Sequence, residues 1–159
     1  MLAQRIYQLE RVEPVAGVPG RLVRADDRHR SMVIDWLTGF DRDAGTTPPV
    51  AADERADSFL HGPDRELYLW FDGGPVSMAA TAGPTPNGLR ISAVYTPPEL
   101  RRRGYASACV AALSQRVLDS GRRYCFLFTD LANPTWNHIY QQIGYHGVCD
   151  VDLYTWQGG

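Results

Sequence analysis

Arginines and small residues follow one another where a predicted strand passes into a predicted helix, in the segment Arg101-Arg-Arg-Gly-Tyr-Ala-Ser107. The first N–H groups of a helix have no partner within the helix and lie at the positive end of its dipole, so they bind anions. Gly104 lets the backbone approach a ligand closely, and Ala106 keeps the next turn clear. The segment predicts a phosphate-binding loop, although it lacks the spacing and the lysine of a P-loop. A solvated basic turn that precedes an ordinary helix is the alternative.

A second segment with chemical potential runs from Thr129 to Tyr145. Asn133 followed by Pro134 is typical of a helix start, with asparagine as N-cap and proline at the first helical position. Tyr140 lies within this predicted helix. A phenol has a pKa of ~10, so it is protonated at pH 7 and can give a proton to a leaving group. A packed aromatic ring without a chemical role is the alternative for Tyr140.

The elements that position these segments follow from hydrophobic periodicity and from the turn residues between them. The chain contains no internal repeat. The order β-α-α-β-β-β-α-β-α-β predicts an α/β (α+β) fold with one mixed sheet and helices packed on its faces. Strands are predicted over 4–13, 66–71, 76–82, 89–95, 124–129 and 148–156, and helices from Asp26 or Asp27 and over 51–61, 104–120 and 133–143.

The two segments together resemble the GNAT superfamily of acyl-CoA-dependent N-acyltransferases. The match consists of Arg/Gln-x-x-Gly-x-Gly/Ala over 101–106 and, one helix and one strand later, Asn-x₆-Tyr-x₃-Gly-Tyr/Phe over 133–145. The resemblance covers residues 66–156, whereas residues 1–65 match only in the order of elements. It implies a single GNAT-like domain over residues 1–159, with a central sheet splayed open where the cofactor enters.

The resemblance also implies roles for individual residues and acetyl-CoA as the cosubstrate. The strand end offers backbone groups to the acyl-pantetheine arm, the loop binds the pyrophosphate, and the asparagine bonds to pantetheine. Tyr140 is the implied proton donor to the departing thiolate. The implied cofactor-binding residues are Val94, Tyr95, Thr96, Arg101, Arg102, Arg103, Gly104, Tyr105, Ala106, Ser107 and Asn133.

Three departures from the family's pattern affect this reading. Arg102 stands where glycine is frequent, and Trp136 stands where a small residue is usual. Some relatives carry a glutamate as general base near the start of the strand before the loop, but residues 87–92 contain no carboxylate. The base therefore stays unassigned. Asp35, Asp41 and Asp43 are read as solvated charges, one of which could hold a cationic amine.

Composition narrows the class of protein further. The 159 residues are 44% hydrophobic and carry a net charge of −2, which argues against binding to nucleic acid or to an anionic membrane. No apolar run approaches the ~20 residues of a membrane span. Three cysteines without CxxC spacing indicate reduced thiols and a cytoplasmic location, with Cys125 and Cys149 in the core. Four histidines without ligand spacing indicate no metal site, and the absence of lysine excludes a lysine Schiff base.

The sequence therefore predicts an N-acetyltransferase. It would move an acetyl group from acetyl-CoA to a primary amine of a small molecule or peptide, by direct attack in a ternary complex. The alternative is a catalytically silent acyl-CoA-binding sensor, which the missing strand carboxylate keeps open. O-acyl transfer or another acyl donor is a third, weaker reading, and assembly as a homodimer is compatible with the sequence.

Overall fold

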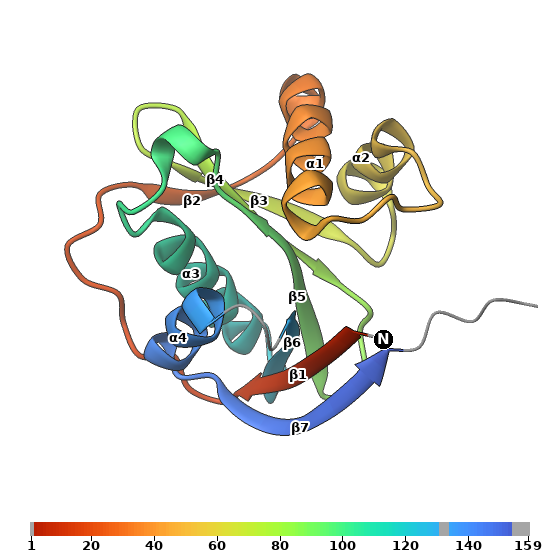
Figure 1. The fold of residues 1–159 in the computed structure, drawn as a ribbon. Helices are drawn as coiled ribbons and strands as arrows, with labels where there is room; N and C mark the ends of the chain where they lie inside the picture. The colour runs from red at the N-terminus through yellow and green to blue at the C-terminus, as the bar shows by residue number, and fades with distance from the viewer. Residues whose placement is uncertain (1, 131–133, 154–159) are drawn as a thin grey trace, which may run out of the picture.

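The computed structural model describes residues 2–130 and 134–153. Seven strands form one sheet in the order β2-β3-β4-β5-β6-β1-β7 (Figure 1). All neighbouring strands are antiparallel except β5 and β6, which are parallel, so the predicted mixed sheet is confirmed. The strands are β1 (Leu2–Leu9), β2 (Arg21–Arg24), β3 (Glu66–Phe71), β4 (Pro75–Ala82), β5 (Gly88–Tyr95), β6 (Tyr124–Asp130) and β7 (His146–Leu153).

Helices cover the two faces of the sheet, each over a cluster of buried apolar side chains. One cluster joins α3 and α4 to one face, and the other joins α1 and α2 to the opposite face over β3, β4 and the end of β5. Figure 1 shows the two helix pairs on either side of the strands. The helices are α1 (Arg30–Ala44), α2 (Ala52–His61), α3 (Tyr105–Asp119) and α4 (Pro134–Ile143), with short 3-10 turns at Asp27–His29 and Pro98–Leu100.

The first part of the chain differs from its prediction in two ways. β1 ends at Leu9 instead of continuing to residue 13. β2 was not predicted, because four residues bounded by arginines, Arg21-Leu-Val-Arg24, are too few for an alternating pattern. β2 is a strand only because its backbone pairs with β3 at the edge of the sheet.

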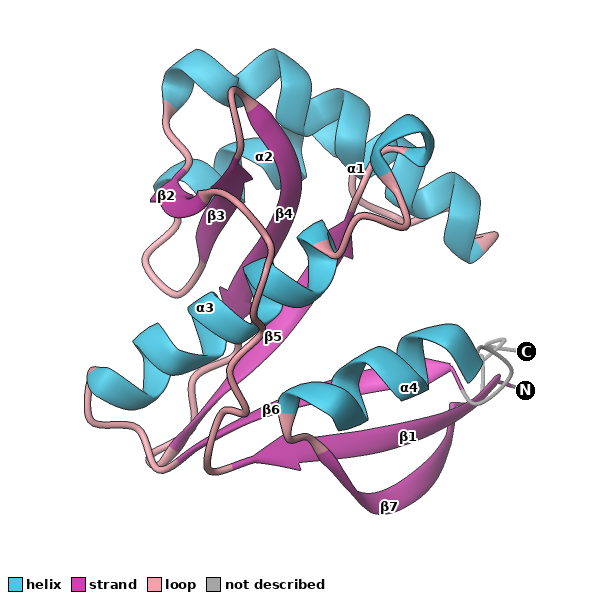
Figure 2. Cartoon of the chain, turned by 90° about the vertical axis from the view of Figure 1, so that its left-hand side faces the viewer, coloured by secondary structure: helices cyan, strands magenta, loops and turns pink. Residues whose placement is uncertain are grey.

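The central sheet splays open between β5 and β6, as predicted. These strands pair over only three residues, Gly88–Arg90 against Tyr124–Phe126. Beyond Arg90 the two strands diverge into a V (Figure 2). A bulge in β5 accompanies the divergence: the register against β4 shifts, and Ala93 adopts a left-handed φ of 50°. The V opens toward the loop that precedes α3.

Candidate active site

The loop between β5 and α3 presents helix N–H groups at the mouth of the V. Gly104 is the N-cap of α3, with a left-handed φ of 82° and no side-chain cap. Arg102 is also left-handed, with φ 68°, which costs a residue with a Cβ about 1–2 kcal/mol. Such strain in a loop points to a functional requirement. The uncapped first turn of α3 can therefore accept an anion, as a pyrophosphate site requires.

Arg101 fixes this loop to its surroundings. Its Nε donates to the carbonyl oxygen of Thr96 at 2.8 Å, and its terminal nitrogen donates to Asp43 at 2.5 Å. The guanidinium also lies 5.7 Å from the centre of the Tyr95 ring. The side chains of Arg102 and Arg103 are exposed and can reach a ligand in solvent. Arg101 thus positions the loop, while its two neighbours supply accessible charge.

Tyr105 ties the start of α3 to the turn between β3 and β4. Its ring is buried, and its hydroxyl donates to the Asp72 carboxylate at 2.6 Å, which contributes most to raising its pKa. The following residues, Ala106 and Ser107, are half-buried in the first turn of α3. The Tyr105 side chain therefore orients the helix, and the predicted contact with the pyrophosphate falls to the backbone.

The end of β5 carries the three residues predicted to face the acyl-pantetheine arm. Val94, Tyr95 and Thr96 are all buried. The Ser77 hydroxyl donates to the Tyr95 carbonyl at 3.0 Å and lies 2.9 Å from the Thr96 hydroxyl. The Tyr95 ring turns toward α1, where Trp36 lies 6.1 Å away. These contacts hold the strand end rigidly at one edge of the V.

Tyr140 lies on the same side of the sheet as α3. Its side chain is 6% exposed, stacks on Trp136 at 5.8 Å and meets the edge of Tyr145 at 6.0 Å. Burial raises the pKa of Tyr140 well above its ordinary value, so the phenol stays protonated. This is the state that a proton donor needs. The hydroxyl of Tyr145 forms a hydrogen bond with the Ser114 hydroxyl, at a distance of 2.7 Å.

Asn133, the predicted partner of pantetheine, lies outside the described residues. A neighbouring polar side chain that the sequence analysis did not single out is Asn137. Its Oδ1 accepts from the Thr129 hydroxyl at 2.7 Å, and its Nδ2 donates to the Asp130 carbonyl at 3.2 Å. These bonds join α4 to the end of β6, so Asn137 helps to position Tyr140. No motif signal marks it, because the contact depends on the fold.

Two of the three acidic residues of α1 are paired with arginines of other elements. Asp41 pairs with Arg55 of α2 at 2.5 Å, both side chains being mostly buried, and Asp43 pairs with Arg101. Reading Asp41 as a solvated charge is therefore wrong, whereas Asp35 and Asp43 are exposed, as predicted. The arginine partners of Asp41 and Asp43 come from other elements, which spacing within one helix does not reveal.

The cysteines do not provide a nucleophile at this site. Cys109 and Cys125 are buried, and burial raises the pKa of the Cys109 thiol to about 12 and that of the Cys125 thiol to about 11. Both remain neutral thiols near pH 7, whereas the thiolate is the nucleophile. Cys149 is exposed on β7, so the prediction that it lies in the core is wrong.

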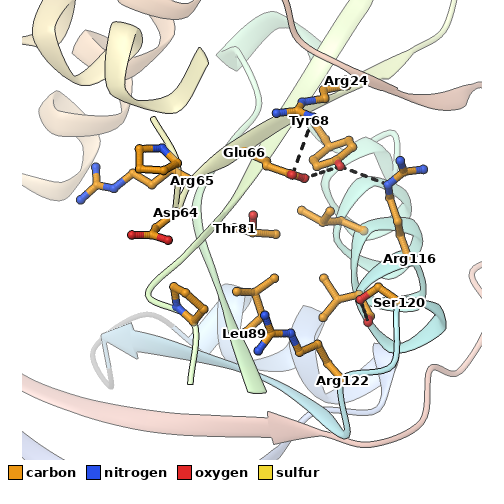
Figure 3. Close-up of a pocket in the computed structure, with 14 residues that line it drawn as sticks. Arg24, Asp64, Arg65, Glu66, Tyr68, Thr81, Leu89, Arg116, Ser120 and Arg122 are labelled. Atoms are coloured by element: carbon orange, nitrogen blue, oxygen red, sulfur yellow. Dashed lines mark hydrogen bonds and ion pairs between the residues drawn. The ribbon is translucent and has the colours of Figure 1, made fainter. Parts of the chain in front are cut away.

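A separate hollow of about 410 Å³ lies at the other end of α3 from Gly104. Figure 3 shows a chain of contacts along it. The Tyr68 hydroxyl donates to Glu66 at 2.6 Å, Arg116 donates to that hydroxyl at 3.1 Å, and Arg24 lies 3.7 Å from Glu66. Glu66 compensates the charge of Arg24, whereas Arg116 meets a neutral phenol, and the hollow is remote from the predicted loop.

Two further observations concern residues 2–130 and 134–153. No three side chains among histidine, cysteine, aspartate and glutamate gather there as a metal site would require. None of the helices in this part of the chain has the length and apolar character to cross a bilayer.

The fold is shared with solved acetyltransferase structures. A protein from Novosphingobium aromaticivorans DSM 12444, assigned to the GNAT acetyltransferases, superposes with a TM-score of 0.68 at 20% identity, over 94% of this chain. This chain spans only 61% of that protein's length. AAC(6')-Iy, solved with a CoA-linked acetylneamine bisubstrate analogue, gives 0.69 at 15% identity over 88% of this chain and 99% of its own.

A Clostridium acetobutylicum protein solved with acetyl-CoA gives a TM-score of 0.63 at 17% identity, over 88% of this chain and 96% of its own. No curated protein matches the chain in sequence. The model of the family described as FR47-like protein matches residues 70–154, more than half of the chain, and this range contains the V, the loop before α3 and Tyr140. The chain therefore belongs to the FR47-like family, and its fold is that of the GNAT acetyltransferases.

Proposed function

We propose that this protein transfers an acetyl group from acetyl-CoA to a primary amine, by direct attack in a ternary complex. The observation that carries the proposal is the divergence of β5 and β6 beyond Arg90, next to the uncapped N-terminus of α3. A pantetheine arm can enter the V while the pyrophosphate binds the first-turn N–H groups. Structural neighbours solved with CoA-linked or acetyl-CoA ligands support this placement.

Within this proposal, residues 101–107 bind the pyrophosphate through backbone N–H groups, with Arg102 and Arg103 adding charge. The strand end over 94–96 pairs with the pantetheine arm, and Asn133 bonds to it further along. Holding the amine next to the thioester supplies a large share of the rate enhancement, because orientation replaces a bimolecular encounter. Backbone donors at the bulge of β5 polarise the thioester carbonyl.

The chemical step forms a C–N bond and breaks the C–S bond. The neutral amine attacks the thioester carbonyl, and the tetrahedral intermediate expels the CoA thiolate. Tyr140 gives its proton to that thiolate and regains one from the ammonium through solvent. A double displacement through an acyl-cysteine is not part of the proposal, because burial keeps the Cys109 and Cys125 thiols protonated.

The test is release of free thiol from acetyl-CoA across a panel of polyamines, aminoglycosides, amino acids and peptides. Turnover with one acceptor class supports the proposal. The second candidate, an acyl-CoA sensor, is favoured by the absence of a carboxylate in residues 87–92. Tight acetyl-CoA binding in calorimetry without turnover of any acceptor would replace the transferase with the sensor.

A further inference from the structure

Arg90 stands at the point of the V. It is the last residue of β5 that pairs with β6, opposite Phe126. Its neighbours Leu89 and Ile91 pack into the cluster that joins α3 to the sheet. Because side chains alternate along a strand, Arg90 faces the other side, on which α1 and α2 lie. An arginine therefore marks the inner end of the opening, on the face away from α3.

The Arg90 side chain reaches across the opening toward its mouth. Its guanidinium carbon lies 4.5 Å from the centre of the Phe128 ring. Phe128 is two residues beyond Phe126, and its backbone lies about 7 Å further along β6, so the guanidinium is directed toward the mouth and not back toward the paired residues. The charge thus lies within the V, partway from its point to the strand end at Val94.

The charge of Arg90 is only partly compensated. Its Nε is buried and has no hydrogen-bond partner among the residues that the structure describes. Burial lowers the pKa of Arg90, and the positive charge of Arg65 lowers it further. A guanidinium nevertheless stays charged near pH 7. Arg90 as a whole is half-buried, so a ligand meets the terminal N–H groups of the guanidinium and not its enclosed Nε.

The position of Arg90 relative to the cosubstrate indicates which ligand this is. In the proposed function the loop that precedes α3 and the Tyr140 side chain of α4 both contact the cosubstrate. The cosubstrate therefore lies on the side of the sheet that carries α3 and α4. An amine must approach the thioester carbonyl from the remaining side, which is the face that carries Arg90. Arg90 pairs with Ala82 of β4 and Tyr95 with Met78, four residues away along β4, so the two positions are about 13 Å apart, and the Arg90 side chain covers roughly half of that distance. The remaining space suits a molecule of amino-acid size.

We propose that Arg90 determines which acceptor the enzyme uses, by binding a carboxylate of that acceptor. The acceptor is then a molecule with both a primary amine and a carboxylate, such as a free amino acid. The guanidinium fork matches a carboxylate with two parallel hydrogen bonds. The same charge repels polycationic acceptors such as aminoglycosides and polyamines. The inference rests on the proposed function, because it assumes that the V holds both substrates.

The test compares kcat/KM for each amino acid with that for its carboxamide, in the wild type, Arg90→Met, Arg90→Lys and Arg123→Met. Arg123 is an exposed arginine just before β6 and is the control. We expect Arg90→Met to lose about 10–100-fold with the amino acid and little with the carboxamide, since a hydrogen bond to a charged group contributes about 1.5–3 kcal/mol. An amino acid and its carboxamide differ in amine basicity, but this difference is the same for every variant. Comparing the amino-acid to carboxamide ratio of kcat/KM between variants therefore removes it.

Arg90→Lys keeps the charge without the guanidinium fork, so we expect an intermediate loss of kcat/KM with the amino acid. If thermal unfolding shows that Arg90→Met does not fold, Arg90→Lys takes its place in the comparison. Equal losses with both acceptors, or a wild-type enzyme that prefers amines without a carboxylate, would overturn the inference. If acetyl-CoA binds but no acceptor is turned over, the transferase proposal fails separately. Calorimetric titration of amino acids into the acetyl-CoA complex then tests the carboxylate site by itself. Amino-acid binding that is lost in Arg90→Met supports the site. Binding that is unchanged in Arg90→Met, or no binding to the wild type, refutes the site.

Discussion

A terminal nitrogen of Arg101 lies 2.5 Å from a carboxylate oxygen of Asp43, which joins the loop before α3 to the end of α1. The Nε of the same arginine donates to the Thr96 carbonyl. One side chain thus holds the loop against the strand end and against a helix from the other face of the sheet. The geometry of the proposed anion site therefore depends on the contacts that Arg101 makes with Thr96 and Asp43.

Replacing Arg101 by methionine is expected to weaken acetyl-CoA binding about tenfold, because the loop loses its bond to Thr96. Asp43→Asn is expected to change affinity less than threefold. The Asp43–Arg101 pair is 48% and 42% exposed, and exposed pairs contribute only about 0–1 kcal/mol. Calorimetry with acetyl-CoA measures both. Equal effects of the two variants would mean that the ion pair, and not the bond to Thr96, positions the loop.

Gly104→Ala and Gly121→Ala separate loop strain from ligand binding. Both glycines flank α3 in left-handed conformations, with φ of 82° and 106°. Each alanine variant is expected to lose about 1–2 kcal/mol of folding stability. A Cβ at Gly104 would also come within 2.9 Å of Val18, whereas Gly121 has open space around it.

Only Gly104 lies in the proposed pyrophosphate site. We therefore expect Gly104→Ala to weaken acetyl-CoA binding at least tenfold and Gly121→Ala to leave it unchanged. Urea unfolding and calorimetry on both variants make the comparison. Undiminished affinity in a folded Gly104→Ala protein would remove the loop from the binding site.

The elements around the loop could be predicted because their signals are local. β3 was predicted with its observed bounds, and α3 begins one residue after the predicted start, since glycine and periodic apolar residues delimit it. The prediction of phosphate binding rested on the helix N-terminus together with the glycine and the arginines that precede it. The roles of individual side chains were harder to predict, because the partners of Tyr105 and Arg101 are distant in sequence.

Arg90 is the clearest example of a side chain whose surroundings could not be predicted from the sequence. In the sequence it is one polar residue in an alternating strand, for which solvent exposure is the ordinary expectation. Its surroundings arise only when β6 pairs beside β5 and then diverges, which brings Phe128 under the guanidinium. A non-local, parallel pairing of this kind has no signature in the residues of either strand.

The buried thiols predict a loss of stability at alkaline pH. The pKa of Cys109 is raised to about 12 and that of Cys125 to about 11, while the pKa of a thiol in an unfolded chain is ~8.5. Above that pH the unfolded chain releases protons that the folded chain retains. The unfolded state then binds fewer protons, so the free energy of unfolding falls as pH rises.

We expect that free energy to be nearly constant from pH 7 to 8 and to decline from about pH 9. Cys109→Ala should make the decline shallower by about 1.4 kcal/mol per pH unit, the contribution of one proton. Urea unfolding at a series of pH values measures the slope. An unchanged slope in the variant would show that the Cys109 thiol titrates alike in both states.

Tyr140→Phe tests the proton donor. The variant keeps the ring, its stacking on Trp136 and its burial, so acetyl-CoA affinity should hardly change. The chemical step should slow by ~10²–10⁴-fold, as loss of a general acid does, and toward the lower end because a thiolate leaves readily. Since burial raises the pKa of Tyr140, its deprotonation should add no alkaline limb to the wild-type rate profile below about pH 10.

Tyr145→Phe is the matched control, because it removes a buried hydroxyl of the same aromatic cluster. Its hydroxyl bonds to Ser114, so the variant should lose about 1 kcal/mol of stability and keep the rate of the chemical step. Single-turnover kinetics, which exclude product release, and thermal unfolding on both variants complete the comparison. A Tyr140→Phe enzyme with wild-type single-turnover rate, or one whose loss matches that of Tyr145→Phe, would reduce Tyr140 to a packing residue.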